Sequence, residues 1–97
     1  QRAKKGGVDG RPNRVEIDNE TSSFYTIVEV FAYDFPGLLY RITDALTRSG
    51  LDIWVAKIST KVDQVVDVFY VRDEQGGKAD SPGRVGQIRS RVLSVLP

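Results

Sequence analysis

The sequence predicts an α+β domain in which a four-stranded antiparallel sheet carries two helices on one face. Two observations predict it. The chain has 97 residues, which is enough for one domain with a single core. Its apolar residues recur at strand or helix spacing in the order strand, strand, helix, strand, strand, helix. Because each amphipathic helix has one apolar stripe to bury, both helices are expected to pack on the sheet.

Two strands are expected before the first helix. Residues 14–18 alternate apolar and polar side chains, and the polar cluster 19–23 is typical of a turn. Residues 24–33 are dense in aromatic and β-branched side chains, with apolar residues on both faces. This second segment is therefore expected at the centre of the sheet.

The first helix is expected to begin at Leu38, where the apolar spacing changes to a helical period. Asp34 is predicted to be its N-cap, because its carboxylate can accept hydrogen bonds from the first free amides. Pro36 presets φ in the first turn, and Gly37 allows a ligand to approach the backbone closely. Gly50 is predicted to end the helix as a left-handed C-terminal cap.

The second half of the chain repeats the order strand, strand, helix. Residues 51–60 and 64–72 are expected to pair as a hairpin across the turn 61–63. The connection from strand 24–33 through the first helix to strand 51–60 is expected to be parallel and right-handed. A polar loop then leads to the second helix. Its expected buried face is Val85, Ile88, Val92 and Leu96, and its expected solvated side carries Arg84, Arg89 and Arg91.

Composition excludes several kinds of chemistry. The chain contains no Cys and no His, which removes the usual zinc sites, thiol redox chemistry and His-dependent triads. Its net charge of +1 divides into +4 over residues 1–14, −6 over 15–77 and +3 over 78–97. This acidic centre disfavours nucleic-acid binding. No apolar run reaches the length of about 18 residues that a membrane helix needs, so no membrane contact and a cytoplasmic location are expected.

Residues 1–13 are expected to form a flexible tail or linker, because they are rich in Gly and poor in apolar side chains. The folded domain is expected over residues 14–97. The chain has no Met, even at position 1, which leads to the expectation that it is a piece of a longer protein.

Two interpretations of residues 34–39 stay open from the residues alone. One is a well-capped helix start with no further role. The other is a site for a small anion, in which unpaired N–H groups and the positive end of the helix dipole at Gly37, Leu38 and Leu39 hold a carboxylate or phosphate.

The chain resembles the ACT domain, a family of small-molecule regulatory modules. The resemblance rests on D-x-P-G-L-L at residues 34–39, followed in order by segments 50–53, 56–60 and 67–73. It implies a ferredoxin-like sheet with two helices. The usual module continues into a last strand after its second helix, whereas this chain stops there. Residues 14–18 are therefore expected to replace that strand at the edge of the sheet.

Segments 14–22 and 66–71 are similar, more narrowly, to the C-terminal ACT domains of bifunctional enzymes that uridylylate and deuridylylate the nitrogen signal protein PII. This resemblance implies a domain that binds an amino acid, glutamine above all, and thereby regulates catalytic domains elsewhere in a longer chain. It implies magnesium for those catalytic domains. No catalytic residue, metal or cofactor is expected in this segment.

The resemblance also implies which residues contact the ligand. They lie in the first strand–helix loop and on a strand expected to face it, and they are Asp34, Pro36, Gly37, Leu38, Leu39, Ile53, Trp54, Val55 and Ala56. Backbone amides would hold the ligand carboxylate, and Asp34 is the candidate for its ammonium group. Trp54 departs from the small or polar residue expected at its place, so it either narrows the pocket or packs on the sheet.

A partner is expected on physical grounds as well. Ile27 and Phe31 oppose Val28 and Val30 on the long strand, so the helices must leave one apolar set uncovered, and exposed apolar patches generally mark contacts. We expect a homodimer or a pair with a sister ACT domain.

Two rival functions are considered. A ligand-independent interaction or dimerisation module would share this fold. An autonomous enzyme of the acylphosphatase type is disfavoured, because Asp34 would repel a phosphate and no suitable Asn stands at the junction. Four scattered carboxylates are interpreted as solvated surface rather than as acid–base pairs or a divalent-metal site. They are Asp44, Asp52, Asp63 and Asp67.

Overall fold

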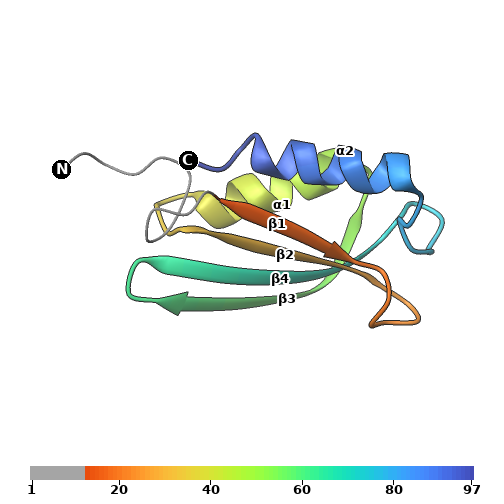
Figure 1. The fold of residues 1–97 in the computed structure, drawn as a ribbon, viewed down its shortest axis with the longest axis horizontal. Coiled ribbons are helices and arrows are strands. Elements are labelled where there is room, and N and C mark those ends of the chain that lie inside the picture. The colour runs from red at the N-terminus through yellow and green to blue at the C-terminus, as the bar shows by residue number, and fades with distance from the viewer. Residues whose placement is uncertain (1–12) are drawn as a thin grey trace.

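The computed structural model describes residues 13–97, which form a sheet with two helices on one of its faces (Figure 1). The elements are β1 (Arg14–Asp18), β2 (Thr26–Tyr33), α1 (Leu38–Arg48), β3 (Asp52–Lys61), β4 (Gln64–Arg72) and α2 (Pro82–Leu93). The strand order is β1-β2-β4-β3, and each neighbouring pair is antiparallel. The predicted α+β fold, compatible with a ferredoxin-like topology, is confirmed. Most of the predicted tail, residues 1–12, lies outside the described residues.

β1 occupies the sheet edge that was predicted for it. It pairs antiparallel with β2, with Val15 opposite Val30 and Ile17 opposite Val28. Val15 and Ile17 lie on the helix side of the sheet, where they join the core. β2 and β3 are both antiparallel to β4 and therefore parallel to each other, as the predicted crossover requires.

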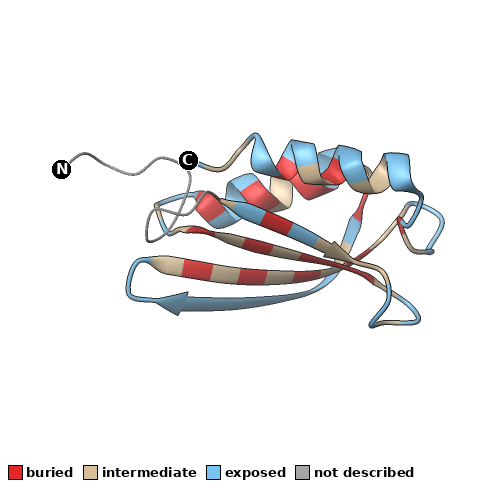
Figure 2. Cartoon of the chain, in the orientation of Figure 1, coloured by how far each residue is buried: buried red, intermediate tan, exposed pale blue. Residues whose placement is uncertain are grey.

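The core lies between the two central strands and the helices. Val28 pairs with Phe69 and Ala32 pairs with Val65, and all four side chains are buried. Figure 2 shows this alternation along β4, whereas β3 is exposed along nearly its whole length. The helices complete the core with Leu38, Ile42, Ala45, Leu46, Ile88 and Val92.

The apolar side chains on the face of β2 away from the helices are less exposed to solvent than expected. Val28 and Val30 lie under the helices, which leaves Ile27 and Phe31 on the other face. Ile27 is nevertheless only 6% exposed. The guanidinium carbon of Arg14 lies 4.0 Å from the centre of the Phe31 ring. Side chains of the same sheet therefore cover much of the apolar surface that was expected to stay open.

The helix ends follow local chemistry. Gly50 follows α1 with φ +80°, so the predicted left-handed cap is confirmed. The Ser81 hydroxyl caps α2 by accepting a hydrogen bond from the Arg84 amide at 3.3 Å. α2 ends before Leu96, which was predicted on its buried face and instead packs on the core from beyond the helix. Neither of these two helices is long and apolar enough to cross a membrane.

Two arginines predicted on the solvated side of α2 bind the main chain of other elements instead. The Arg84 Nη2 donates to the Ser49 carbonyl oxygen at 2.8 Å, where it meets the negative end of the α1 dipole. The Arg89 Nε donates to the Val15 carbonyl oxygen at 3.3 Å. Of the three, Arg91 alone is exposed. Long side chains reach such carbonyls while their aliphatic stems cover apolar surface.

The two ends of the described chain lie side by side. The Asn13 side-chain amide donates a hydrogen bond to the Pro97 carbonyl oxygen at 2.7 Å. Val95 and Leu96, just before Pro97, pack against the core. The first and last described residues therefore lie at the same place on the surface.

Replacing Gly50 by Ala is expected to lower the free energy of unfolding by about 1–2 kcal/mol, because a side chain disfavours positive φ. A Cβ there would also lie 2.5 Å from the Glu74 Oε2, so that carboxylate must move. Gly86→Ala in α2 is the control, because nothing lies within 4 Å of its Cβ position and Ala favours a helix by about 0.5–1 kcal/mol. Urea unfolding followed by circular dichroism measures both. Equal effects would contradict the cap assignment.

Candidate functional site

A tight turn joins β2 to α1. The Leu38 N–H donates to the Phe35 carbonyl oxygen at 3.1 Å, and Gly37 has φ +87° and ψ 0°. These features match a type II β-turn with Pro36 at the second position and Gly37 at the third, where a positive φ is required. A Cβ at Gly37 would meet no other described atom within 4 Å. The need for Gly is therefore conformational, and the space beside it is open.

The prediction that Asp34 is the N-cap of α1 is wrong. Gly37 occupies the N-cap position, and no side chain accepts a hydrogen bond there. The turn separates Asp34 from the helix. The Asp34 N–H donates to the Asp63 carbonyl oxygen at 2.8 Å. No side chain among the described residues caps the first turn of α1, as the small-anion interpretation requires. The Leu38 N–H, however, is not unpaired, because it donates to the Phe35 carbonyl oxygen.

This end of the sheet presents most of its predicted site residues to solvent. Asp34, Pro36, Gly37 and Leu39 are exposed, whereas Leu38 is buried in the core. Leu38 offers no free group to a ligand, because its side chain is buried and its N–H donates to the Phe35 carbonyl oxygen.

The other predicted site residues lie at the start of β3, where the strand is irregular. Ile53 pairs with Val71 and Val55 pairs with Tyr70, so Trp54 is an extra residue in a β-bulge. Ile53 is half-buried, and the next three residues of the strand, including Ala56, are exposed.

Trp54 packs on the sheet, which is one of its two predicted alternatives. Its ring centre lies 6.4 Å from that of Tyr25, and the Tyr25 ring meets Tyr70 edge-on at 5.9 Å. The Arg72 guanidinium carbon lies 4.7 Å from the Tyr25 ring centre and 4.9 Å from that of Trp54, within the range of cation–π attraction. Trp54 still keeps 58% of its surface exposed.

The two groups of predicted site residues do not meet within one chain. Ile53 aligns through Val71 with Thr26 at the start of β2, whereas Asp34 follows the last residue of β2. The eight residue steps from Thr26 to Asp34, at about 3.3 Å each, put these points about 26 Å apart along the sheet. The start of β3 therefore does not face the loop, and a pocket lined by both would need two copies of the chain.

β4 carries a buried carboxyl group that sequence reasoning placed wrongly on the solvated surface. Asp67 is only 1% exposed and pairs with Val30 in the middle of the sheet. Val65 and Phe69, two residues before and after it, are buried in the core, so Asp67 lies on the same face. This alternation is the signal that could have placed it. Its Oδ1 has no hydrogen-bond partner among the described residues.

The surroundings of Asp67 make it a weak acid. Burial raises the pKa of Asp67 to about 6, and the negative charge of Asp34 raises it further. By contrast, the pKa values of Asp18 and Asp73 are lowered, because hydrogen bonds within their own turns stabilise the charged forms. The charge of Asp34 therefore acts on Asp67, although the strand register separates the two by four residues along the sheet.

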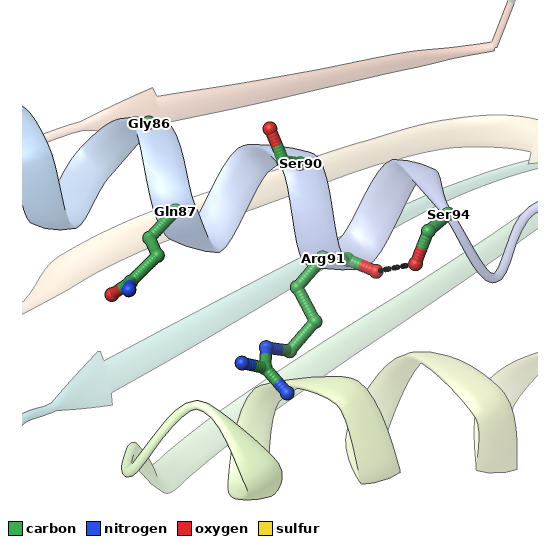
Figure 3. A pocket seen from close by; sticks show the side chains of 5 residues that line it. All are labelled: Gly86, Gln87, Ser90, Arg91 and Ser94. Atoms are coloured by element: carbon green, nitrogen blue, oxygen red, sulfur yellow. Dashed lines mark hydrogen bonds between the residues drawn. The ribbon is translucent and has the colours of Figure 1, made fainter.

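A hollow on α2 contains none of the predicted site residues. It has a volume of about 560 Å³ and is lined by Gly86, Gln87, Ser90, Arg91 and Ser94 (Figure 3). The Ser94 hydroxyl donates to the Arg91 carbonyl oxygen at 2.7 Å, a contact local to the helix. Because four of the five residues belong to α2 and Ser94 is its C-cap, no second element lines this hollow, and the β2–α1 turn remains the candidate site.

Comparison with known proteins relates most of the chain to one kind of enzyme. The chain is 48% identical to the bifunctional uridylyltransferase/uridylyl-removing enzyme of Azospirillum brasilense, 45% to that of Gluconobacter oxydans and 42% to that of Rhodospirillum rubrum, each over 85 residues. These matches cover 88% of this chain but only 9% of each relative. No family model and no solved structure matches the chain.

The chain is thus similar to a small segment of these bifunctional enzymes. This agrees with the predicted resemblance to uridylylating enzymes. None of the relatives is named for an ACT domain, so that narrower assignment stays a prediction.

The free energy of unfolding is expected to depend on pH through Asp67. The folded chain keeps this carboxyl protonated up to a pH of about 6, whereas the unfolded chain releases the proton near 3.8. Stability from this group is therefore lost as the pH rises between these values, by on the order of 3 kcal/mol. Asp67→Asn has no carboxyl group to titrate at this position, so this loss is absent. Its free energy of unfolding in urea is therefore expected to rise relative to that of the parent between pH 4 and pH 7. A difference independent of pH would contradict this.

Proposed function

We propose that the chain is a regulatory ACT domain that binds an amino acid, glutamine above all. Occupancy of the site controls catalytic domains elsewhere in a longer enzyme, which attach uridylyl groups to the PII protein and remove them. Magnesium serves those catalytic domains. The similarity to segments of bifunctional uridylyltransferase/uridylyl-removing enzymes is the observation that carries this proposal.

The geometry of the β2–α1 turn supports it. The exposed Pro36 and Gly37 lead directly into first-turn amides that no side chain caps. Such amides, together with the positive end of the helix dipole, suit the carboxylate of a free amino acid. Because binding through backbone amides requires no catalytic side chain, the lack of His and Cys is compatible with a sensor.

The exposed edge strand supports a site shared by two copies. β3 has a neighbour on one side only, since it stands last in the strand order. If two copies pair antiparallel along this edge, the bulged start of β3 in one copy lies beside the end of β3 in the other. That end adjoins the β2–α1 turn, because Asp34 is hydrogen-bonded to Asp63 in the β3–β4 connection. The two groups of predicted site residues then come together across the pair.

Isothermal titration of the folded chain with L-glutamine tests binding. Gly37→Ala is expected to weaken glutamine binding at least about tenfold, because a methyl group enters the space beside the amides and positive φ becomes strained. Gly76→Ala is the matched control, since Gly76 also has φ +80° and no atom within 4 Å of its Cβ position, but lies in another loop. Equal affinities of both variants would remove the turn from the site. A folded chain that gives no heat with any of the twenty amino acids would sink the proposed function.

A ligand-independent dimerisation module is the second candidate. The exposed side chains of β3 favour it, because Trp54, Val55 and Ile58 are 58%, 41% and 47% exposed on an unpaired edge. Aromatic side chains of this kind are enriched at protein interfaces.

Sedimentation velocity with and without glutamine separates the two functions. For a sensor with a shared site, glutamine is expected to strengthen dimerisation, because ligand that binds only the pair shifts the equilibrium toward it. Ile58→Lys, which puts a charge on the edge, is expected to give a monomer under both conditions. A dimer dissociation constant that stays the same when any of the amino acids is added would favour the second candidate.

A further inference from the structure

The sheet face opposite the helices (the helix-free face) has no second layer among the described residues (Figure 1). Its side chains alternate along each strand with those of the core. Apolar side chains fill its middle, and they are Ile27, Phe31, Val66, Val68 and Tyr70. Ile27 is buried by its neighbours, whereas the other four keep part of their surface exposed. Apolar surface of this kind marks contacts, and the charges around it indicate the partner.

One row of residues crosses the helix-free face from edge to edge. The strand register places Glu16 on β1 opposite Glu29 on β2. It places Glu29 opposite Val68 on β4, which in turn lies opposite Lys57 on β3. Neighbouring strands are about 4.8 Å apart, so Glu29 and Lys57 stand about 10 Å apart across the sheet. The row is therefore acidic on two strands, apolar on the third and basic on the last.

Two charges of this row lack a partner of opposite charge within residues 13–97. Glu16 and Glu29 lie directly opposite each other, where like charges are destabilising. The Arg14 Nε lies 2.8 Å from the Glu16 Oε2, but no ion pair of the described residues includes Glu29 or Lys57. The Lys57 ammonium nitrogen instead lies 5.2 Å from the centre of the Tyr70 ring, on the helix-free face.

A second copy of the chain supplies both missing partners. If two copies stack through this face about a two-fold axis parallel to the strands, β1 of one copy lies over β3 of the other, and β2 lies over β4. The row then faces itself in reverse order, so the acidic side of each copy meets Lys57 of the other. Stacked sheets lie about 10 Å apart with strands within about 30° of each other, and a Glu and a Lys side chain together span that distance.

The neighbouring rows fit the same arrangement. They bring Phe31 over Val66 and Ile27 over Tyr70, so apolar side chains face apolar ones. A two-fold axis perpendicular to the strands would instead lay each strand on its own counterpart, which brings the acidic residues together and Lys57 against Lys57. The charges therefore select one of the two possible axes.

We propose that the helix-free face is a self-complementary interface, at which two copies stack sheet to sheet with Glu29 of each copy paired to Lys57 of the other. This contact needs no ligand and does not depend on the proposed function. It also differs from pairing along the β3 edge. Ile58 on that edge lies opposite the buried Asp67, on the helix side of the sheet, so the two contacts can be tested separately.

The stacked pair is expected to be weak, with a dissociation constant of about 1 mM, because one copy already covers much of its own apolar surface. At the far lower concentrations of sedimentation velocity it leaves Ile58→Lys monomeric. The test therefore follows dilution of the Ile58→Lys chain from about 1 mM to about 0.1 mM in two-dimensional ¹H–¹⁵N NMR spectra. The amide signals of Val66, Val68 and Tyr70 are expected to shift, and those of α2 are expected to stay in place.

Exchange of charges then tests the ion pairs, with Ile58→Lys present in every sample. Lys57→Glu puts like charges together twice in the symmetric pair, so it is expected to weaken stacking at least about tenfold and to abolish the dilution shifts. Adding Glu29→Lys to Lys57→Glu restores opposite charges and the parent's net charge, and is expected to restore the shifts. Arg91→Glu is the control, because it makes the same change of charge on the exposed side of α2.

The rescue distinguishes an interface from a general effect of charge. Shifts that Lys57→Glu abolishes, that the double variant recovers and that Arg91→Glu leaves intact support the proposal. The proposal is overturned if dilution of the folded chain moves no signal of the helix-free face. It is equally overturned if Arg91→Glu acts like Lys57→Glu, or if the double variant behaves like the single one. None of these readings involves glutamine, so they leave the proposed function untouched.

Discussion

The antiparallel pairing of β2 with β4 decides most of what this domain presents to its surroundings. With Val28 opposite Phe69, one set of alternating side chains is placed under the helices and the other on the far face. A slip by one residue would exchange the two sets, so the helices could not pack. The same register leaves no choice for Asp67. Because Val65 and Phe69 must face inward, the residue between them on that face is carried into the core with its carboxyl group.

This register also gives the two ends of the sheet different chemistry. At the end where β2 leaves the sheet, α1 begins at a turn whose amides no side chain caps. At the other end, Arg72 lies between the rings of Tyr25 and Trp54 and covers apolar surface with a cation.

Periodicity was sufficient to predict the fold, because the strands and helices of this chain bury single, regularly spaced apolar sets. The order of the elements and the left-handed Gly50 follow from local pattern, whereas the edge position of β1 was predicted from the resemblance to the ACT domain. The predictions that were wrong depended on how different elements contact one another. Asp34 has the composition of an N-cap, but the turn through Gly37 intervenes. Arg84 has the spacing of a solvated residue, but the end of α1 lies within its reach. The separation of the two groups of site residues appears only once the strand register is known.

The contact between Asn13 and Pro97 has a mechanical consequence. Since Asn13 and Pro97 lie at one point, connections at these two residues can place the domain in a surface loop of another protein without stretching it. A force that pulls the two residues apart loads β1 at one of them and the segment after α2 at the other. β1 would peel from β2 one residue pair at a time, beginning where Arg14 meets Phe31. Sequential peeling of this kind needs less force than shearing a whole strand at once.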